Sequence, residues 1–131
     1  MIDHEVDIFN ELYSVVAPMC ANNKFVSVQI VSPVALPAAS LIEIDNSTVR
    51  DRQSSTPGEN YAVITYQLDV YASTKHQCKA IFSEADERMI LLGFNRINMV
   101  YSENSDNPHV HRYIGRYRAE IDQNGTLYRH P

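Results

Sequence analysis

The chain has 131 residues, of which 44% are hydrophobic and 21% are charged, and its net charge is −5. This length suits one domain, and the composition is that of a globular protein, not of a disordered chain. The negative charge argues against nonspecific nucleic-acid binding, which needs Lys and Arg to neutralise phosphates, and no apolar run is long enough to cross a membrane.

The first segment predicts a helix over Asp3–Val16, because its apolar residues recur at helical spacing. Asp3 is the predicted N-cap, and Pro18 should end the helix near Ala17. The start of the chain is acidic, whereas a secretory signal begins with basic residues. We therefore do not expect a secreted protein.

Two strands and a polar loop are predicted next. Alternating apolar and polar residues predict a half-buried strand over Phe25–Val31, and a second strand is predicted over Ser40–Ile44. Residues 45–59 contain almost no apolar side chains and end in Pro57-Gly58, which is typical of a loop. A loop of this length in a compact domain usually has a use, such as contact with a partner.

The clearest elements lie in the middle of the chain. Strict alternation predicts a strand over Tyr61–Ala72, and a capping-box pattern then opens an amphipathic helix over Thr74–Leu92, with Gly93 as its C-terminal cap. Cys78 falls on the apolar face of this helix. We expect Cys78 and Cys20 to be reduced, and Cys78 to be a buried structural thiol.

The remaining segments predict an antiparallel end of a sheet. Strands are expected at Ile97–Tyr101 and His111–Ile121, followed by the turn Asp122–Gly125 and a short edge over Thr126–Arg129. The expected fold is therefore a single α+β domain over residues 1–131. In it a mainly antiparallel β-sheet packs against two α-helices in the order α-β-β-β-α-β-β.

Searches for catalytic and metal-binding patterns favour a non-enzyme. His109 and His111 alternate on a strand and resemble a metal-ligand pair, but a structural zinc site needs four ligands. A metal-dependent enzyme using this pair is the weakest hypothesis. Ser54 and Ser55 lack a nucleophile elbow, and no phosphate-binding glycine motif is present. We expect no catalytic residues, no metal and no cofactor.

The late strand interleaves tyrosines with arginines, a pattern also found on nucleic-acid surfaces. Tyr113 and Tyr117 alternate onto the face expected to be buried, whereas Arg116, Arg118 and Glu120 fall on the opposite face. Buried tyrosines and solvated arginines explain this pattern better. We expect no specific nucleic acid, and an interaction or assembly module.

The element order resembles that of the tail terminator and tail completion proteins of long-tailed bacteriophages. The resemblance includes the long strand feeding a helix that ends in Leu91-Leu92-Gly93-Phe94, then Arg96 and the Arg116–Asp122 strand. It implies a homo-oligomeric ring of six copies at the head-tail junction of the virion, assembled in the host cytoplasm. The implied partners are the tail-tube and head connector proteins.

Two groups of polar residues are the expected contacts of such a ring. An alternative hypothesis is a small non-enzymatic α+β adaptor or ligand-binding domain, because a fold alone does not determine function. A deep apolar pocket or an isologous dimer would favour that alternative. The expected partner-binding residues are Arg50, Asp51 and Arg52 in the polar loop and Arg116, Arg118 and Glu120 on the late strand.

Overall fold

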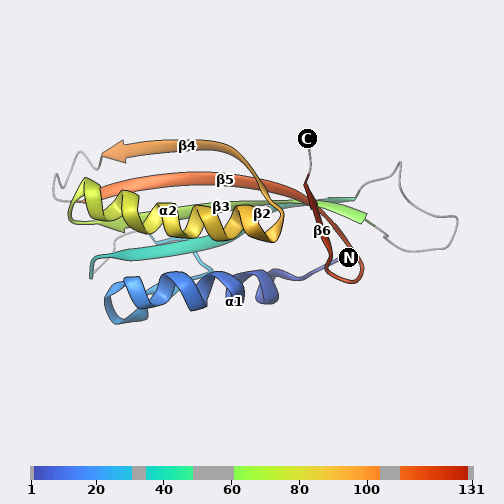
Figure 1. The fold of residues 1–131 in the computed structure, drawn as a ribbon, viewed down its shortest axis with the longest axis horizontal. Coiled ribbons are helices and arrows are strands. Elements are labelled where there is room, and N and C mark those ends of the chain that lie inside the picture. Colours follow the sequence, from blue (N-terminus) through green and yellow to red (C-terminus); the bar gives the residue numbers. More distant parts are fainter. Residues whose placement is uncertain (1, 31–34, 49–60, 104–109, 130–131) are drawn as a thin grey trace, which may run out of the picture.

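The computed structural model describes residues 2–30, 35–48, 61–103 and 110–129, and these form an α+β fold. Six strands make one sheet in the order β1-β2-β3-β5-β4, with β6 paired to β5 (Figure 1). The β1–β2 pair is parallel, and the other pairs are antiparallel. The elements are α1 (Glu5–Val16), two 3-10 turns (Ala17–Met19 and Ala21–Asn23), β1 (Phe25–Val26), β2 (Ala38–Thr48), β3 (Tyr61–Ala72), α2 (Lys75–Leu92), β4 (Asn95–Glu103), β5 (His111–Asp122) and β6 (Leu127–Arg129).

Both helices pack on one face of the sheet, which we call the covered face. The buried side of α1 and the buried side of α2 belong to one core cluster with inward residues of β2, β3 and β5. β3 is central, because it pairs along its whole length with β5 and along most of it with β2. The strand predicted at Tyr61–Ala72 is confirmed. The largest fully buried side chains include Tyr66, Tyr117, Phe82, Phe94 and Leu12.

The predicted signals of α2 are confirmed at both ends. The Thr74 hydroxyl oxygen accepts a hydrogen bond from the Gln77 backbone N–H at 3.1 Å, as an N-cap does. Gly93 ends the helix with a φ of 117°, a conformation that favours glycine. Cys78 is buried, and burial raises the pKa of its thiol to about 11. The thiol is therefore a poor nucleophile.

A glycine on β5 lets α2 approach the sheet closely. A Cβ atom at Gly115 would lie 2.6 Å from Cζ of Phe82, which is closer than real Cβ contacts allow. The Phe82 ring therefore lies directly over the β5 backbone. This contact fixes the position of α2 along the strand.

The helix α1 is confirmed, but its cap differs from the prediction. His4 occupies the N-cap position, and its side chain makes no capping hydrogen bond. Asp3 is one residue too early to be the N-cap, although its carboxylate accepts a hydrogen bond from the Glu5 backbone N–H at 3.2 Å. The turn that follows α1 begins at Ala17, as Pro18 predicted.

The two strands predicted between α1 and the polar loop need correction. β1 covers only Phe25–Val26, and residues 27–30 lie outside any strand. The Ile30 carbonyl oxygen accepts a hydrogen bond from the Tyr71 hydroxyl at 3.1 Å instead of a bond from a neighbouring strand. β2 runs over Ala38–Thr48, because its pairing with β3 continues past a bulge near Ile44. The first residues of the predicted loop are therefore strand.

Candidate interaction surface

The strand β4 forms one edge of the sheet and exposes apolar side chains. Residues 96–100 are all exposed, and three of them are large and apolar: Ile97 is 46% exposed, Met99 42% and Val100 48%. Within the part of the chain that the structure describes, β4 pairs only with β5. Edge strands of soluble monomers usually carry charges, prolines or a covering element. The middle of β4 is therefore a candidate interaction surface.

Both ends of β4 are held by aromatic contacts. Phe94, just before the strand, is buried and meets Tyr66 edge to face at 5.5 Å. Near the other end, the Tyr101 ring lies 5.1 Å from the Tyr113 ring. The strand is thus anchored on either side of residues 96–100. Within this stretch the pairing of β4 with β5 shifts in register between Arg96 and Asn98.

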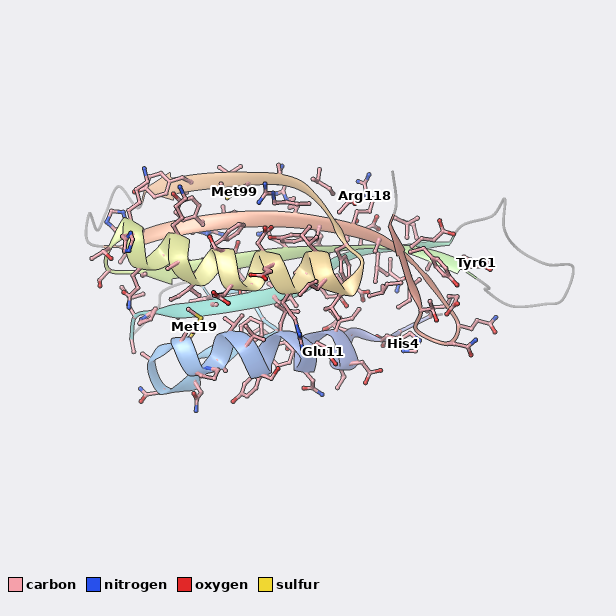
Figure 2. All side chains as sticks on the ribbon, in the orientation of Figure 1. His4, Glu11, Met19, Tyr61, Met99 and Arg118 are labelled. Carbon is pink, nitrogen blue, oxygen red and sulfur yellow. The ribbon has the colours of Figure 1, made fainter. Side chains whose placement is uncertain are left out.

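Two of the three predicted contact residues on β5 border this edge. Arg116 and Arg118 are exposed, and in the strand register they face Asn98 and Asn95 of β4. Figure 2 shows Arg118 and Met99 at the same edge of the molecule. We call the exposed residues 96–100 of β4, together with Arg116 and Arg118, the β4 surface.

Glu120, the third predicted contact on β5, is buried rather than exposed. It is 8% exposed, because β5 has strands on both sides at this point and Glu120 lies between Val63 of β3 and Tyr128 of β6. The expectation that Glu120 is an exposed contact is therefore corrected. Arg50, Asp51 and Arg52, the other predicted contacts, lie outside the described residues.

The face of the sheet opposite the helices, which we call the open face, contains a buried ion pair. An Arg112 Nη atom lies 3.1 Å from a carboxylate oxygen of Asp69, whose side chain is 1% exposed. Gln67 also donates to Asp69, at 3.2 Å, and accepts a hydrogen bond from Nε of Arg116 at 3.3 Å. This network links the middle of the sheet to the β4 surface. It positions Arg116 rather than leaving it free.

The tyrosines of β5 are buried, as the alternation predicted. Tyr117 lies in the core, and its hydroxyl donates to a carboxylate oxygen of Asp86 on α2 at 2.7 Å. Arg96 of β4 contacts the same carboxylate at 3.2 Å. Tyr113 is also buried, so neither of these two tyrosines of β5 is exposed for stacking on bases. The interleaved pattern is confirmed as core tyrosines with solvated arginines.

Three further observations on the described residues concern metal or ligand binding. Within the described ranges, no group of three or more His, Cys, Asp or Glu is placed to hold a metal ion. His111 Nδ1 lies 2.6 Å from the Tyr101 hydroxyl oxygen, and His109 lies outside the described residues. A depression bordered by Glu5, Val6, Phe9 and Ser27 has a volume of about 80 Å³. Pockets for small molecules usually measure roughly 300–1,000 Å³.

One carboxyl group on the covered face has an unusual pKa. Glu43 of β2 lies near the start of α1, and burial raises its pKa to about 7, with further contributions from the charges of Glu5 and Asp3. The Tyr66 hydroxyl faces the same carboxylate. The Asn46 side chain donates to the Ile2 carbonyl oxygen at 2.8 Å and holds the chain start against β2. The cluster thus brings three carboxyl groups, those of Glu43, Glu5 and Asp3, together at the start of α1.

Among the residues that the structure describes, no helix is both long and apolar enough to cross a bilayer.

The sequence reasoning missed the exposed apolar part of β4. The strand itself was predicted at Ile97–Tyr101, and the structure extends it to Asn95–Glu103. Its position at the sheet edge depends on strand order, which no local pattern specifies. The available signal was the absence of strict alternation in residues 95–100, where polar and apolar residues do not separate onto two faces.

A scan against protein-family models found no match to this sequence, and a search of curated proteins found no relative.

Proposed function

We propose that this chain is a structural assembly protein that forms a closed ring of its own copies. The observation that carries the proposal is the open β4 edge, with three large apolar side chains exposed on the strand. An edge of this kind is a template for association, and natural monomers usually protect it. The element order adds support, because it resembles that of phage tail terminator and tail completion proteins. We therefore infer a six-membered ring at the head-tail junction of a virion.

In this role the protein has no chemical step to perform. Its partners are further copies of itself, and in the assembled virion the tail-tube and head connector proteins. The β4 surface offers apolar contact area, and the neighbouring arginines add charge that selects and orients a partner. The polar loop predicted over residues 45–59 stays a predicted contact segment: residues 45–48 belong to β2, and residues 49–59 lie outside the described residues.

Native mass spectrometry tests the proposal directly. The chain alone, and the chain mixed with a candidate tail-tube protein, should give a closed oligomer, expected to be a hexamer. Met99→Lys with Val100→Lys should abolish it, because two desolvated ammonium groups oppose burial of the edge. The matched control is Leu91→Lys, since Leu91 is an exposed apolar residue on α2 and is 71% exposed. The control should assemble normally.

A chain that stays monomeric at high concentration and binds no tail-tube or connector protein would contradict the proposal. An isologous dimer would instead favour the adaptor hypothesis. Circular dichroism of the lysine variants should match that of the wild type, because the substituted side chains are exposed. Loss of assembly then reports on the surface and not on folding.

A further inference from the structure

We propose that the β4 surface of one copy docks on α1 of the next copy, so that the copies associate head to tail; this inference rests on the proposed self-assembly. The receiving area, which we call the α1 surface, consists of Val6, Phe9 and Tyr13 with the acidic side chains of Glu5 and Asp7 beside them. It is a second apolar area on the molecule, separate from β4.

The α1 surface is exposed and structurally fixed. Val6 is 71% exposed, and Tyr13 is also exposed on the outer side of the helix. The Phe9 ring stacks on the buried Phe25 ring, with centroids 4.8 Å apart and planes 4° apart, and the Tyr13 ring lies 6.3 Å from Phe25. Because this aromatic base is preformed, a partner that binds it orders few side chains.

The α1 surface also contains a depression of a size that suits one side chain of a partner. The depression of about 80 Å³ is bordered by Val6 and Phe9, with Glu5 and Ser27 completing its rim. Too small for a typical ligand, it suits one aliphatic side chain. The β4 surface offers Ile97 and Met99, both exposed. Met99 is the better candidate, because an unbranched, flexible side chain adapts to an irregular depression.

Charge complementarity favours a contact between these two unlike surfaces. The α1 surface carries Glu5 and Asp7, and the Asp7 side chain is 81% exposed, whereas Glu11 of the same helix is paired with Arg88 of α2. The β4 surface carries the exposed Arg116 and Arg118, whereas Arg96 is paired with Asp86 of α2. A contact of either surface with its own copy would bring like charges together, which is unfavourable. The occupant of the β4 surface is therefore α1 of a second copy of this chain.

The positions of the two surfaces determine the kind of assembly. Figure 1 shows β4 along one edge of the molecule and α1 along the opposite edge. Contacts between unlike surfaces are heterologous, and they generate rings when the rotation between neighbours closes. An exposed apolar group that fits a depression elsewhere on the same molecule is a known route to such contacts. The arrangement thus explains why a ring, and not a dimer, should form.

Cysteine cross-linking tests the proposed pairing of surfaces. A double variant carrying Val6→Cys and Met99→Cys should form a ladder of disulfide-linked dimers, trimers and larger species under mild oxidation. Each single variant should stay monomeric on a non-reducing gel, because its new thiol faces no cysteine in the neighbouring copy. The native Cys20 and Cys78 are buried and should not take part. Val6→Cys combined with Leu91→Cys is the matched control and should give no ladder.

A mixing experiment provides a second readout that needs no disulfide geometry. Val6→Lys and Met99→Lys should each prevent assembly, because each removes one of the two surfaces. An equimolar mixture should form a heterodimer and stop there, since only one intact surface of each kind is present. Native mass spectrometry distinguishes this heterodimer from either homodimer.

Two outcomes would overturn the inference while leaving the proposed function standing. One is a disulfide-linked dimer from Met99→Cys alone, which indicates that β4 meets β4. The other is normal assembly of the Val6→Lys variant while the wild type is oligomeric, which places the interface elsewhere. A wild-type chain that neither self-associates nor binds tail-tube protein would overturn both the inference and the proposed function.

Discussion

The covered face and the open face of the sheet bury their side chains by different means. On the covered face, two helices contribute apolar and aromatic side chains to one core cluster that includes Tyr66 and Tyr117 of the sheet. On the open face, no described helix lies over the sheet, yet Asp69, Ser40 and Thr65 are buried. Burial there relies on a polar network around Asp69 and on a small second cluster that includes Ile30 and Tyr71.

The covered face contributes most to folding stability, whereas the open face leads to the candidate interaction surface. The covered face contains most of the buried apolar surface, which is the main source of folding free energy. The open face holds its arginines through hydrogen bonds and one buried ion pair, and it continues into the exposed β4 edge. Substitutions on the covered face should therefore change the free energy of unfolding most. Substitutions on the β4 surface should change assembly and leave that free energy almost unchanged.

The largest effect is expected at Phe82, where α2 meets the sheet. Phe82→Ala removes a ring that is buried against Gly115 and Tyr113, so it should lower the free energy of unfolding by about 3–5 kcal/mol. Urea denaturation followed by circular dichroism measures the change. Leu91→Ala, at an exposed position of the same helix, is the control and should cost less than about 1 kcal/mol. Equal losses for both variants would contradict the assignment of the core to the covered face.

A somewhat smaller effect is expected from the buried ion pair of the open face. Asp69→Ala leaves Arg112 without its carboxylate partner, and the Arg112 side chain is 28% exposed. Because solvent partly compensates this arginine, we expect a loss of about 2–3 kcal/mol in the free energy of unfolding, less than for a fully buried pair.

The matched control for Asp69 is the exposed pair of Glu11 with Arg88, which joins α1 to α2 at 3.0 Å. Glu11→Gln should lower the free energy of unfolding by less than about 1 kcal/mol, and added salt should reduce this difference further. If the two substitutions destabilised the protein equally, the polar network would not be the basis of burial on the open face.

The sequence predicted the covered face better than the open face, for a physical reason. The alternation of Tyr61–Ala72, the Thr74 cap and Gly93 are local signals that depend on neighbouring residues along the chain. Beyond the end of β1 at Val26, the Ile30 carbonyl oxygen instead accepts a long-range hydrogen bond from the Tyr71 hydroxyl. No local pattern indicates such a partner.

The candidate interaction surface could also be predicted only in part, because it depends on contacts between distant segments. Alternation along β5 predicted that Arg116 and Arg118 are exposed, and the structure confirms this exposure. It placed Glu120 on the same face correctly but did not predict its burial, which comes from the pairing of β6 beside β5. The exposed middle of β4 likewise follows from strand order, which is a property of the whole sheet. Partner surfaces at sheet edges are thus hard to predict from one sequence.

Glu43 lies where α1 meets the covered face. We expect it to change the free energy of unfolding by about 1–2 kcal/mol in a pH-dependent way. Burial raises its pKa from 4.5 to about 7, with Glu5 and Asp3 adding to the shift and Tyr66 facing the carboxylate. The folded state thus disfavours the ionised form, so this group lowers stability increasingly as the pH rises from about 4.5 to about 7.

Glu43→Gln should remove this pH dependence, because the amide stays neutral. Urea denaturation at several pH values should show the variant to be more stable than the wild type above a pH of about 7, with little difference below about 4.5. Asp7→Asn is the control, since Asp7 lies on the exposed side of α1. Parallel stability curves for the wild type and Glu43→Gln would show that this carboxyl group is not desolvated by α1.

The smallest of these effects concerns the start of α2, one of the two helices on the covered face. Thr74→Ala removes the hydroxyl oxygen that accepts the Gln77 backbone N–H, so it should lower the free energy of unfolding by about 1 kcal/mol. Ser73→Ala, at the preceding exposed residue, should change it by less than about 0.5 kcal/mol. Thr74→Ser keeps the accepting oxygen and should retain most of the stability. Because the substitution leaves the exposed side chains of residues 96–100 untouched, Thr74→Ala should also form the same oligomer as the wild type, although the adjacent Lys75 lies over the Tyr101 ring at the end of β4. A loss of assembly in this variant, with its fold intact, would indicate that the interface reaches the start of α2 and is not confined to the sheet edge.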